Sequence, residues 1–317
     1  MLGFSASSRG RRRVVLVARA KVNLGLEVLG RRADGYHELR SLLWAIDLAD
    51  RVTLDARPEG IAVECDVPQV PSTTENLAWR AAELFRREAG IDAGVRIRIA
   101  KVIPVAAGLG GGSADAAAVL VGLGDLWGVR LPRARLLALA TRLGMDVPFF
   151  LGRGPAVASG RGGELRPVAT RQVVPLVLVN PGLPVATREV YARLGPADWT
   201  TGQAVRRLAA AVPGGARALA LGLVNGLERV VRSLWPGLTE VKAALVDAGC
   251  LAAVMSGSGP TVIGLAASHA AARRAETRLR DRPWRTWVTR TVAGPALSRE
   301  DGPAPRGERS SWGVAKR

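Results

Sequence analysis

The chain of 317 residues contains only two cysteines and two histidines, and aromatic residues make up 4% of it. Cys65 and Cys250 lie far apart and form no disulfide framework, so a reducing compartment, the cytoplasm, is the expected location. Because His37 and His269 are the only histidines, a histidine-rich zinc site is not expected. The scarcity of aromatics, with no lysine run interleaved among them, also argues against a nucleic-acid-binding surface.

Long apolar runs are absent as well. The apolar run of residues 14–18 ends at Arg19 and is too short for a signal peptide. Residues 248–272 contain no Asp, Glu, Lys or Arg, but the Ser-Gly-Ser-Gly-Pro sequence at 256–260 would break a membrane helix. We therefore expect two buried strands around a loop in this region, and no membrane partner.

Basic residues are in excess, and the formal net charge is +18. Residues 1–13 contain four arginines, residues 302–317 contain four basic residues, and the rest are mostly single arginines in expected helices. A basic surface around a pocket for an anionic substrate, an arginine-favouring composition, or nucleic-acid binding would each explain this charge, nucleic acid being the least favoured. The 48% hydrophobic content is typical of a globular chain, long enough for two domains.

The order of the expected elements predicts an α+β fold with an antiparallel sheet. We expect strands at 14–29, 95–99, 176–179, 251–255, 261–265 and 284–291, an edge hairpin of 51–54 with 61–65, and a strand or short helix at 39–48. We expect helices from a capping box at 72–75 to about Gly90, then at 113–127, 132–143, 187–194, 203–212, 217–233, 237–248 and 268–280. Residues 153–170 are expected to be loop-rich.

A glycine-rich loop precedes the helix expected at Ser113, and residues 101–120 read KVIPVAAGLGGGSADAAAVL. Consecutive glycines before a helix leave backbone N–H groups uncovered, which favours an anion such as a nucleotide phosphate. Apolar segments on both sides disfavour a flexible linker, whereas glycines kept for close helix packing are a second alternative. The loop matches neither the Walker A pattern nor the dinucleotide fingerprint, so a phosphate loop of another kind is required.

Phosphoryl transfer also needs charge neutralisation, a base and a positioned acceptor. Asp146 begins the run Asp-Val-Pro-Phe-Phe, where a carboxylate among apolar residues is costly unless it is paired; an N-cap or turn aspartate is the structural alternative. Lys21, in an apolar strand, is either a snorkelling or edge lysine or a partner for that carboxylate. Asn23 lies on the same strand face as Lys21.

Two further features are candidates for ligand recognition. Tyr36 and His37 follow the turn signal Asp34-Gly35. An aromatic face with a hydrogen-bonding ring suits a planar group such as a base. The alternative is that both are ordinary residues of a hairpin without a ligand. The loop of residues 256–259 is either a tight hairpin turn or a second loop for a phosphate-bearing ligand.

Five motifs in order resemble the GHMP kinase superfamily and, within it, the family of 4-diphosphocytidyl-2-C-methyl-D-erythritol kinases, ATP-dependent enzymes of the non-mevalonate isoprenoid pathway. The resemblance runs from about Val15 to about Val292. The motifs are AKVNLGL at 20–26, RADGYHEL at 32–39, PVAAGLGGGSADAA at 104–117, DVPFF at 146–150 and MSGSG at 255–259.

The resemblance implies a two-domain GHMP-kinase fold. An N-terminal domain like the ribosomal protein S5 domain 2 would span 14–158, a ferredoxin-like α/β sandwich would span 159–298, and disordered tails would span 1–13 and 299–317. The implied reaction transfers a phosphoryl group from ATP, with Mg²⁺, to the C2 hydroxyl of 4-(cytidine 5'-diphospho)-2-C-methyl-D-erythritol. The enzyme would be a monomer or homodimer. Mevalonate- or homoserine-type kinases are the alternative, against which Tyr36 and His37 argue.

The resemblance also implies residue roles. Asp146 would be the general base, and Lys21 would orient the hydroxyl and hold Asp146 as a carboxylate; Ser113 would lie near the metal. The implied ATP-binding residues are Asn76, Lys101, Pro104, Val105, Ala106, Ala107, Gly108, Leu109, Gly110, Gly111, Gly112, Ser113 and Ala114. The implied substrate-binding residues are Asn23, Tyr36, His37, Thr187, Tyr191, Ser256, Gly257, Ser258 and Gly259. Met145 and Gly226 depart from the usual pattern of the family, Gly226 where an aspartate is usual.

Overall fold

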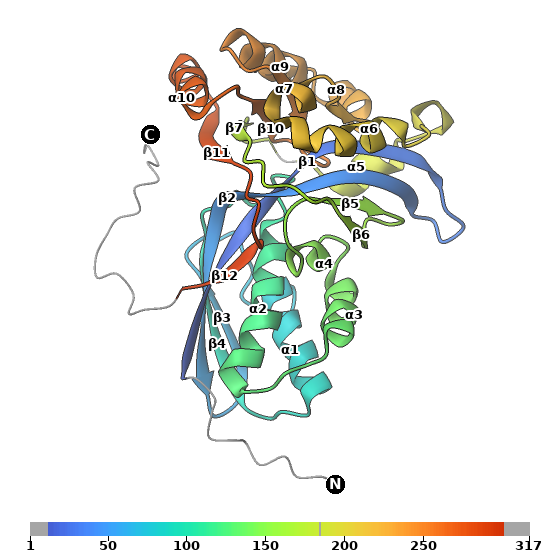
Figure 1. Ribbon diagram of the computed structural model, residues 1–317. Coiled ribbons are helices and arrows are strands. Elements are labelled where there is room, and N and C mark those ends of the chain that lie inside the picture. The colour runs from blue at the N-terminus through green and yellow to red at the C-terminus, as the bar shows by residue number, and fades with distance from the viewer. Residues whose placement is uncertain (1–11, 184, 301–317) are drawn as a thin grey trace.

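The computed structural model describes residues 12–183 and 185–300 (Figure 1). In this part of the chain, the larger of two sheets has eight strands. Five follow the order β12-β1-β2-β4-β3, β5 pairs with β2, β6 pairs with β5, and β8 pairs with β1. These strands are β1 (Arg13–Arg31), β2 (His37–Arg57), β3 (Ile61–Cys65), β4 (Gly94–Ala100), β5 (Ala156–Ser159), β6 (Glu164–Pro167), β8 (Val224–Asn225) and β12 (Leu297–Arg299).

Four helices lie beside this sheet in the lower half of Figure 1. They are α1 (Leu77–Ala89), α2 (Gly111–Trp127), α3 (Arg133–Leu143) and α4 (Val147–Phe150). Helices α1 and α2 pack on the sheet, and α3 and α4 pack on those two helices and on each other. Helix α2 is rich in alanine and glycine, and it lies so close to the sheet that a β-carbon on Gly122 would be 2.5 Å from Leu54 and 2.6 Å from Leu16. The small side chains therefore let the helix that follows the glycine-rich loop sit directly on β1 and β2.

The second sheet has four antiparallel strands, in the order β11 (Arg285–Arg290), β7 (Pro175–Asn180), β10 (Val262–Leu265) and β9 (Ala252–Met255). Alternate side chains of β7 face opposite ways, as the period of a strand requires. Val177 and Val179 pack with α8 (Glu228–Leu234), α9 (Gly237–Asp247) and α10 (His269–Arg278). The helices α5 (Thr187–Ala192), α6 (Gln203–Ala211) and α7 (Gly215–Ala220) complete the upper half of Figure 1.

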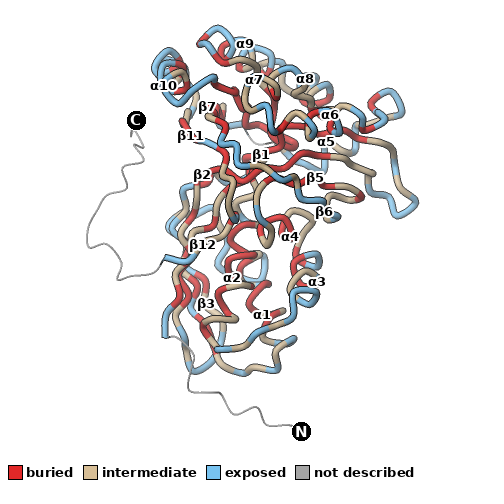
Figure 2. Tube along the Cα trace, in the orientation of Figure 1, coloured by how far each residue is buried: buried red, intermediate tan, exposed pale blue. Residues whose placement is uncertain are grey.

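The ribbon of β1 and β2 joins the two halves. Its strands have 19 and 21 residues, and they continue from the lower sheet to the underside of the second sheet (Figure 1). There Val22 and Trp44 share a core with Leu176, Leu178 and Ile263. Figure 2 shows the resulting buried zone running through both halves. The ribbon thus places the predicted residues of β1 between two packed cores.

Several local predictions are wrong. Of the two alternatives for residues 39–48, strand is correct, and the strand continues through 51–54. The expected hairpin is wrong, because β4 lies between β2 and β3 and pairs with β3 in parallel. The expected helix at 217–233 is broken between α7 and α8, where β8 pairs with β1.

Other differences concern ends and loops. Asn76 caps α1 in place of a capping box at 72–75. The segment expected to be loop-rich contains β5 and β6. Arg13 and Arg299 lie in strands, not in tails; residues 1–11 and 301–317 of the predicted tails lie outside the described residues. None of the helices that the structure describes is long and apolar enough to cross a membrane.

Candidate active site

The glycine-rich loop connects β4 to α2 and has the backbone that its glycines permit. Gly108 and Gly110 have φ values of 74° and 71°, in the left-handed region that favours glycine. A β-carbon on Gly108 would lie 2.3 Å from the carbonyl oxygen of Ser256, and one on Gly110 would lie 3.0 Å from Lys21 Cγ. The glycines therefore allow the loop to touch both the loop of residues 256–259 and the lysine of β1.

The start of α2 is open. Its first intrahelical hydrogen bond runs from the N–H of Ala114 to the carbonyl of Gly110, at 2.9 Å. The N–H groups of Gly111, Gly112 and Ser113 precede that bond and have no intrahelical acceptor, since the first N–H groups of any helix lack one. Such N–H groups and the helix dipole favour an anion, and the predicted phosphate contact stays a prediction.

Lys21 and Asp146 face each other beside this loop. Lys21 Nζ lies 3.4 Å from Asp146 Oδ2, and the side chains are 5% and 40% exposed. Asp146 precedes the short helix α4, but its side chain makes no capping hydrogen bond. The structural alternative of a capping aspartate therefore does not describe it; the carboxylate faces a buried ammonium and remains accessible to a ligand.

Asn23 extends this polar row along β1. Its Oδ1 accepts a hydrogen bond from Lys21 Nζ at 2.7 Å, and its Nδ2 donates to Ser41 Oγ at 2.8 Å. Its backbone N–H donates to Ser256 Oγ at 3.2 Å, and Ser256 Oγ donates to the Gly108 carbonyl at 3.0 Å. The predicted residues of β1, the glycine-rich loop and the loop of residues 256–259 thus form one connected network.

The predicted recognition residues lie at the other end of the β1–β2 ribbon. Tyr36 is 53% exposed, and the ring of His37 lies 5.4 Å from that of Tyr191 in α5. Burial, and secondarily the charge of Arg31, lower the pKa of His37, so its ring is neutral at pH 7. Burial, and secondarily the charge of Asp146, raise the pKa of Tyr191.

Thr187 and the loop of residues 256–259 also meet. Thr187 Oγ1 lies 2.7 Å from Ser258 Oγ, and a β-carbon on Gly257 would lie 3.3 Å from Asn23 Oδ1 and 3.6 Å from Lys21 Nζ. The structure therefore brings the predicted substrate residues of both halves to the same side of Lys21.

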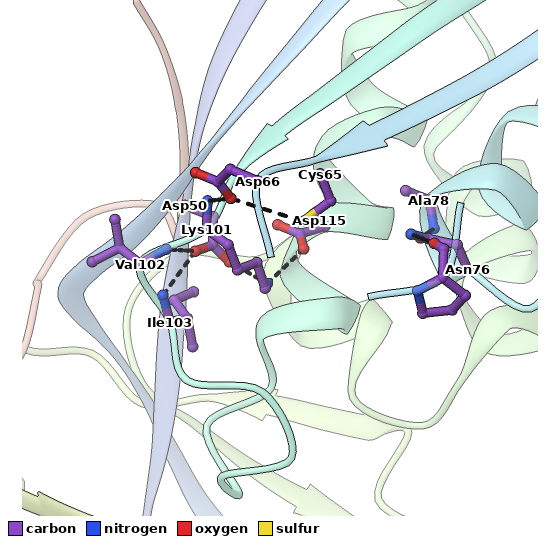
Figure 3. Close-up of polar contacts among 10 residues, drawn as sticks. Asp50, Cys65, Asp66, Asn76, Ala78, Lys101, Val102, Ile103 and Asp115 are labelled. Atoms are coloured by element: carbon purple, nitrogen blue, oxygen red, sulfur yellow. Dashed lines mark hydrogen bonds and ion pairs between the residues drawn. The ribbon is translucent and has the colours of Figure 1, made fainter. Parts of the chain in front are cut away.

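Lys101, predicted to bind ATP, is engaged elsewhere. Its Nζ donates to Asp50 Oδ2 at 2.5 Å and to Asp115 Oδ2 at 2.7 Å, and its side chain is 5% exposed (Figure 3). Asp50 Oδ1 also accepts hydrogen bonds from the N–H groups of Val102 and Ile103, at 2.6 and 2.8 Å. This buried triad ties the beginning of the glycine-rich loop to the first turns of α2, so Lys101 supports the loop from behind.

Asp115 is the carboxylate of the triad whose charged form is least favoured. Its Oδ1 is buried without a hydrogen-bond partner among the described residues. Burial raises its pKa to about 7, with Lys101 opposing the rise and Asp50 adding to it. Two carboxylates therefore share one ammonium in a site that water does not reach.

Asn76 uses its polar atoms locally. Its Oδ1 accepts from the Ala78 N–H at 2.8 Å and its Nδ2 donates to the Pro71 carbonyl at 2.7 Å (Figure 3). These bonds fix the start of α1, and the predicted contact with adenine stays a prediction.

Sequence reasoning missed several residues that build the site. Asn225 Nδ2 donates to the carbonyls of Met255 and Gly257, at 2.7 and 2.8 Å, and supports the loop of residues 256–259 from beneath. The departure at Gly226 removes none of these bonds. Asp50 and Asp115 were also missed; their signal was a carboxylate within apolar sequence, the same signal that pointed to Asp146.

A resident metal site is not part of this arrangement. In the described residues, no group of three or more His, Cys, Asp or Glu could hold a metal ion. Mg²⁺ that accompanies a nucleotide takes most of its ligands from phosphate and water. The predicted place of a metal near Ser113, in the first turn of α2, stays a prediction.

Comparison with known proteins agrees with this geometry. Residues 76–154 match the GHMP kinases N terminal domain and residues 208–284 match the GHMP kinases C terminal model. A 4-diphosphocytidyl-2-C-methyl-D-erythritol kinase from a Synechococcus species is 46% identical over 84% of this chain and 89% of the relative.

The chain belongs to the family of 4-diphosphocytidyl-2-C-methyl-D-erythritol kinases. A crystal structure of 4-(cytidine 5'-diphospho)-2C-methyl-D-erythritol kinase, 42% identical, superposes with a TM-score of 0.78 over 88% of this chain and all of that chain. A homoserine kinase from Cytophaga hutchinsonii has a TM-score of 0.74 at 20% identity, over 95% of this chain and all of that one. That second likeness concerns the fold alone. The GHMP kinase fold expected from the motifs is therefore confirmed.

Proposed function

We propose that this protein transfers the γ-phosphoryl group of ATP to the C2 hydroxyl of 4-(cytidine 5'-diphospho)-2-C-methyl-D-erythritol, giving the 2-phosphate and ADP. Membership of the kinase family supports the reaction. The observation that carries the mechanism is the Lys21–Asp146 pair, 3.4 Å apart between the glycine-rich loop and the loop of residues 256–259.

ATP would bind with its triphosphate on the glycine-rich loop. The open N–H groups of residues 111–113 would bind phosphate oxygens, and the helix dipole would favour their charge. Mg²⁺ bound with the nucleotide would neutralise the charge that develops on the phosphates. The triad around Lys101 would hold the two ends of the loop at a fixed separation while the nucleotide binds.

Asp146 would act as the general base. In the step, the C2 oxygen forms a bond to the γ-phosphorus as the bond from that phosphorus to the oxygen of ADP breaks, and the hydroxyl proton passes to Asp146. The ammonium of Lys21, held by Asn23 Oδ1 at 2.7 Å, would hydrogen-bond the acceptor oxygen and fix its orientation. No covalent intermediate with the protein is needed.

The cytidine would bind at the tip of the β1–β2 ribbon. Tyr36 offers an exposed ring for stacking. His37, neutral at pH 7, offers both a donor and an acceptor for a base edge. A mevalonate or homoserine acceptor has no nucleobase to use these two rings.

A coupled ADP-release assay tests the proposal. The cytidine diphosphate substrate, mevalonate and homoserine would be compared at equal concentration. We expect kcat/KM for the cytidine substrate to exceed the other two by at least about 100-fold, since a site with buried polar groups rejects ligands that leave them unpaired. Equal or higher activity with mevalonate or homoserine would reassign the enzyme within the superfamily.

A further inference from the structure

Arg161 stacks on Tyr36. It lies in the turn between β5 and β6, and its guanidinium carbon is 3.5 Å from the centroid of the Tyr36 ring. A guanidinium stacked on an aromatic face is attracted to the ring and orients it. One face of Tyr36 is therefore covered, yet the residue remains 53% exposed, which leaves the other face for a ligand.

The turn that carries Arg161 is fixed to the start of β2. The N–H of Gly160 donates to Glu38 Oε1 at 3.1 Å, and the N–H of Leu39 donates to the Gly160 carbonyl at 2.8 Å. These two hydrogen bonds therefore fix the position of Arg161 relative to Tyr36. Tyr36 and Arg161 both lie within a few residues of these two hydrogen bonds.

Met145 lies beside the same turn, on the side of the proposed general base Asp146. A β-carbon on Gly162 would lie 3.8 Å from Met145 Cβ, and one on Gly163 would lie 3.7 Å from Met145 Sδ. The residue next to Asp146 thus contacts the turn of Arg161. Met145, which departs from the family's usual pattern, therefore lies between this turn and Asp146 in the structure.

Arg161 makes no salt bridge within the described part of the chain, although its charge helps to lower the pKa of Asp34. The nearby carboxylates of Asp34 and Glu38 pair with Arg32, at 3.1 and 2.6 Å. Arg161 Nε is buried and has no hydrogen-bond partner among the described residues. Because no carboxylate forms an ion pair with this half-buried guanidinium, its terminal N–H groups can serve an acceptor on a ligand.

We propose that Arg161 is a specificity-determining residue of the substrate site: it holds the Tyr36 ring for the cytosine and binds the adjoining diphosphate with its guanidinium. The proposal rests on the proposed function, because it assigns a second group to the same ligand. Its chemistry is general, since a planar cation with several donors suits phosphate oxygens.

The test compares Arg161→Ala and Arg161→Gln with Arg166→Ala. Arg166 is exposed on β6 of the same hairpin, so the control removes the same charge away from Tyr36. Glutamine keeps a flat side chain and serves where alanine disturbs folding, which thermal melting would detect. We expect KM for the cytidine substrate to rise about 10-fold in both Arg161 variants, a loss of about 1.4 kcal/mol, with kcat and KM for ATP within about 2-fold of wild type.

Inhibition constants separate the base from the diphosphate. CDP and cytidine would each be titrated as inhibitors against the cytidine substrate. We expect Arg161→Gln to weaken CDP about 10-fold and cytidine by less than about 3-fold. Equal weakening of both, or a KM equal to that of Arg166→Ala, would overturn the proposal. A wild-type enzyme without activity on the cytidine substrate would instead overturn the proposed function.

Discussion

Gly108 and Ser256, 148 residues apart, are in direct contact: the Ser256 carbonyl oxygen occupies the space that a β-carbon on Gly108 would need. Ser256 Oγ also donates to the Gly108 carbonyl. Two loops from different halves of the chain are therefore held together by a pair of small residues. Each loop depends on the other for its shape.

The first prediction concerns this contact. Gly108→Ala would place Cβ 2.3 Å from the Ser256 oxygen at a φ of 74°, so we expect affinity for a non-hydrolysable ATP analogue to fall at least about 10-fold. Gly60→Ala is the matched control, because Gly60 has the same φ and nothing within 4 Å of the added atom. Calorimetric titration of both variants would measure the difference. If the two lose affinity equally, backbone strain and not the loop contact is responsible.

The second prediction tests the base. Asp146→Asn keeps the size of the side chain but cannot take a proton, so we expect kcat to fall by about 10²–10⁴-fold while the ATP analogue still binds. Steady-state ADP release and calorimetry would measure the two effects separately. Turnover close to wild type would remove Asp146 from this role. If the protein were instead a nucleic-acid-binding module, salt-sensitive DNA or RNA binding would survive this substitution.

The third prediction concerns Tyr36. Tyr36→Ala removes the stacking face, and we expect KM for the cytidine substrate to rise by about 10-fold, since base–aromatic stacking is worth about 1–3 kcal/mol. Tyr36→Phe keeps the face and should stay within about 3-fold of wild type. KM for ATP should not change in either variant. An equal effect on ATP would mean that the partition between nucleotide and substrate sites is wrong.

The fourth prediction is a pH dependence of stability. The raised pKa of Asp115, about 7 against an ordinary 3.8, means that the folded protein binds a proton that the unfolded chain has already lost between these values. The contribution of Asp115 to the free energy of unfolding therefore falls as pH rises from about 4 to about 7. Asp115→Asn should remove this part of the slope. Urea unfolding at several pH values would measure it, and parallel curves for the two proteins would contradict the assignment.

The sequence indicated which polar residues lie close together, and it failed on some pairings of strands. Lys21 and Asp146 were identified because polar residues within apolar segments are costly, and the structure brings them within 3.4 Å. Their roles, like those of the other site residues, stay predictions. Lys101 was assigned to ATP by the resemblance to the family, and that role stays a prediction; nothing local showed that Asp50, 51 residues earlier, lies beside it.

Pairings between distant segments account for the errors in the strands and helices. The hairpin expected for residues 51–54 and 61–65 fails because β4, which comes later in the chain, inserts between them. The predicted helix at 217–233 has helical composition, but Asn225 leaves it to support the loop of residues 256–259. Arg161 gave no signal, because its partner Tyr36 is 125 positions away and meets it through tertiary structure alone.

The β1–β2 ribbon has a consequence for any attempt to divide the chain. Val22 and Trp44, from the N-terminal part, fill the core beneath Leu178 and Ile263. A fragment that begins at residue 159 would expose that apolar underside to water, and we expect it to aggregate or to need the ribbon supplied in trans. We therefore expect the two halves of this kinase to fold as one unit, so that the glycine-rich loop and the loop of residues 256–259 form in the same folding step.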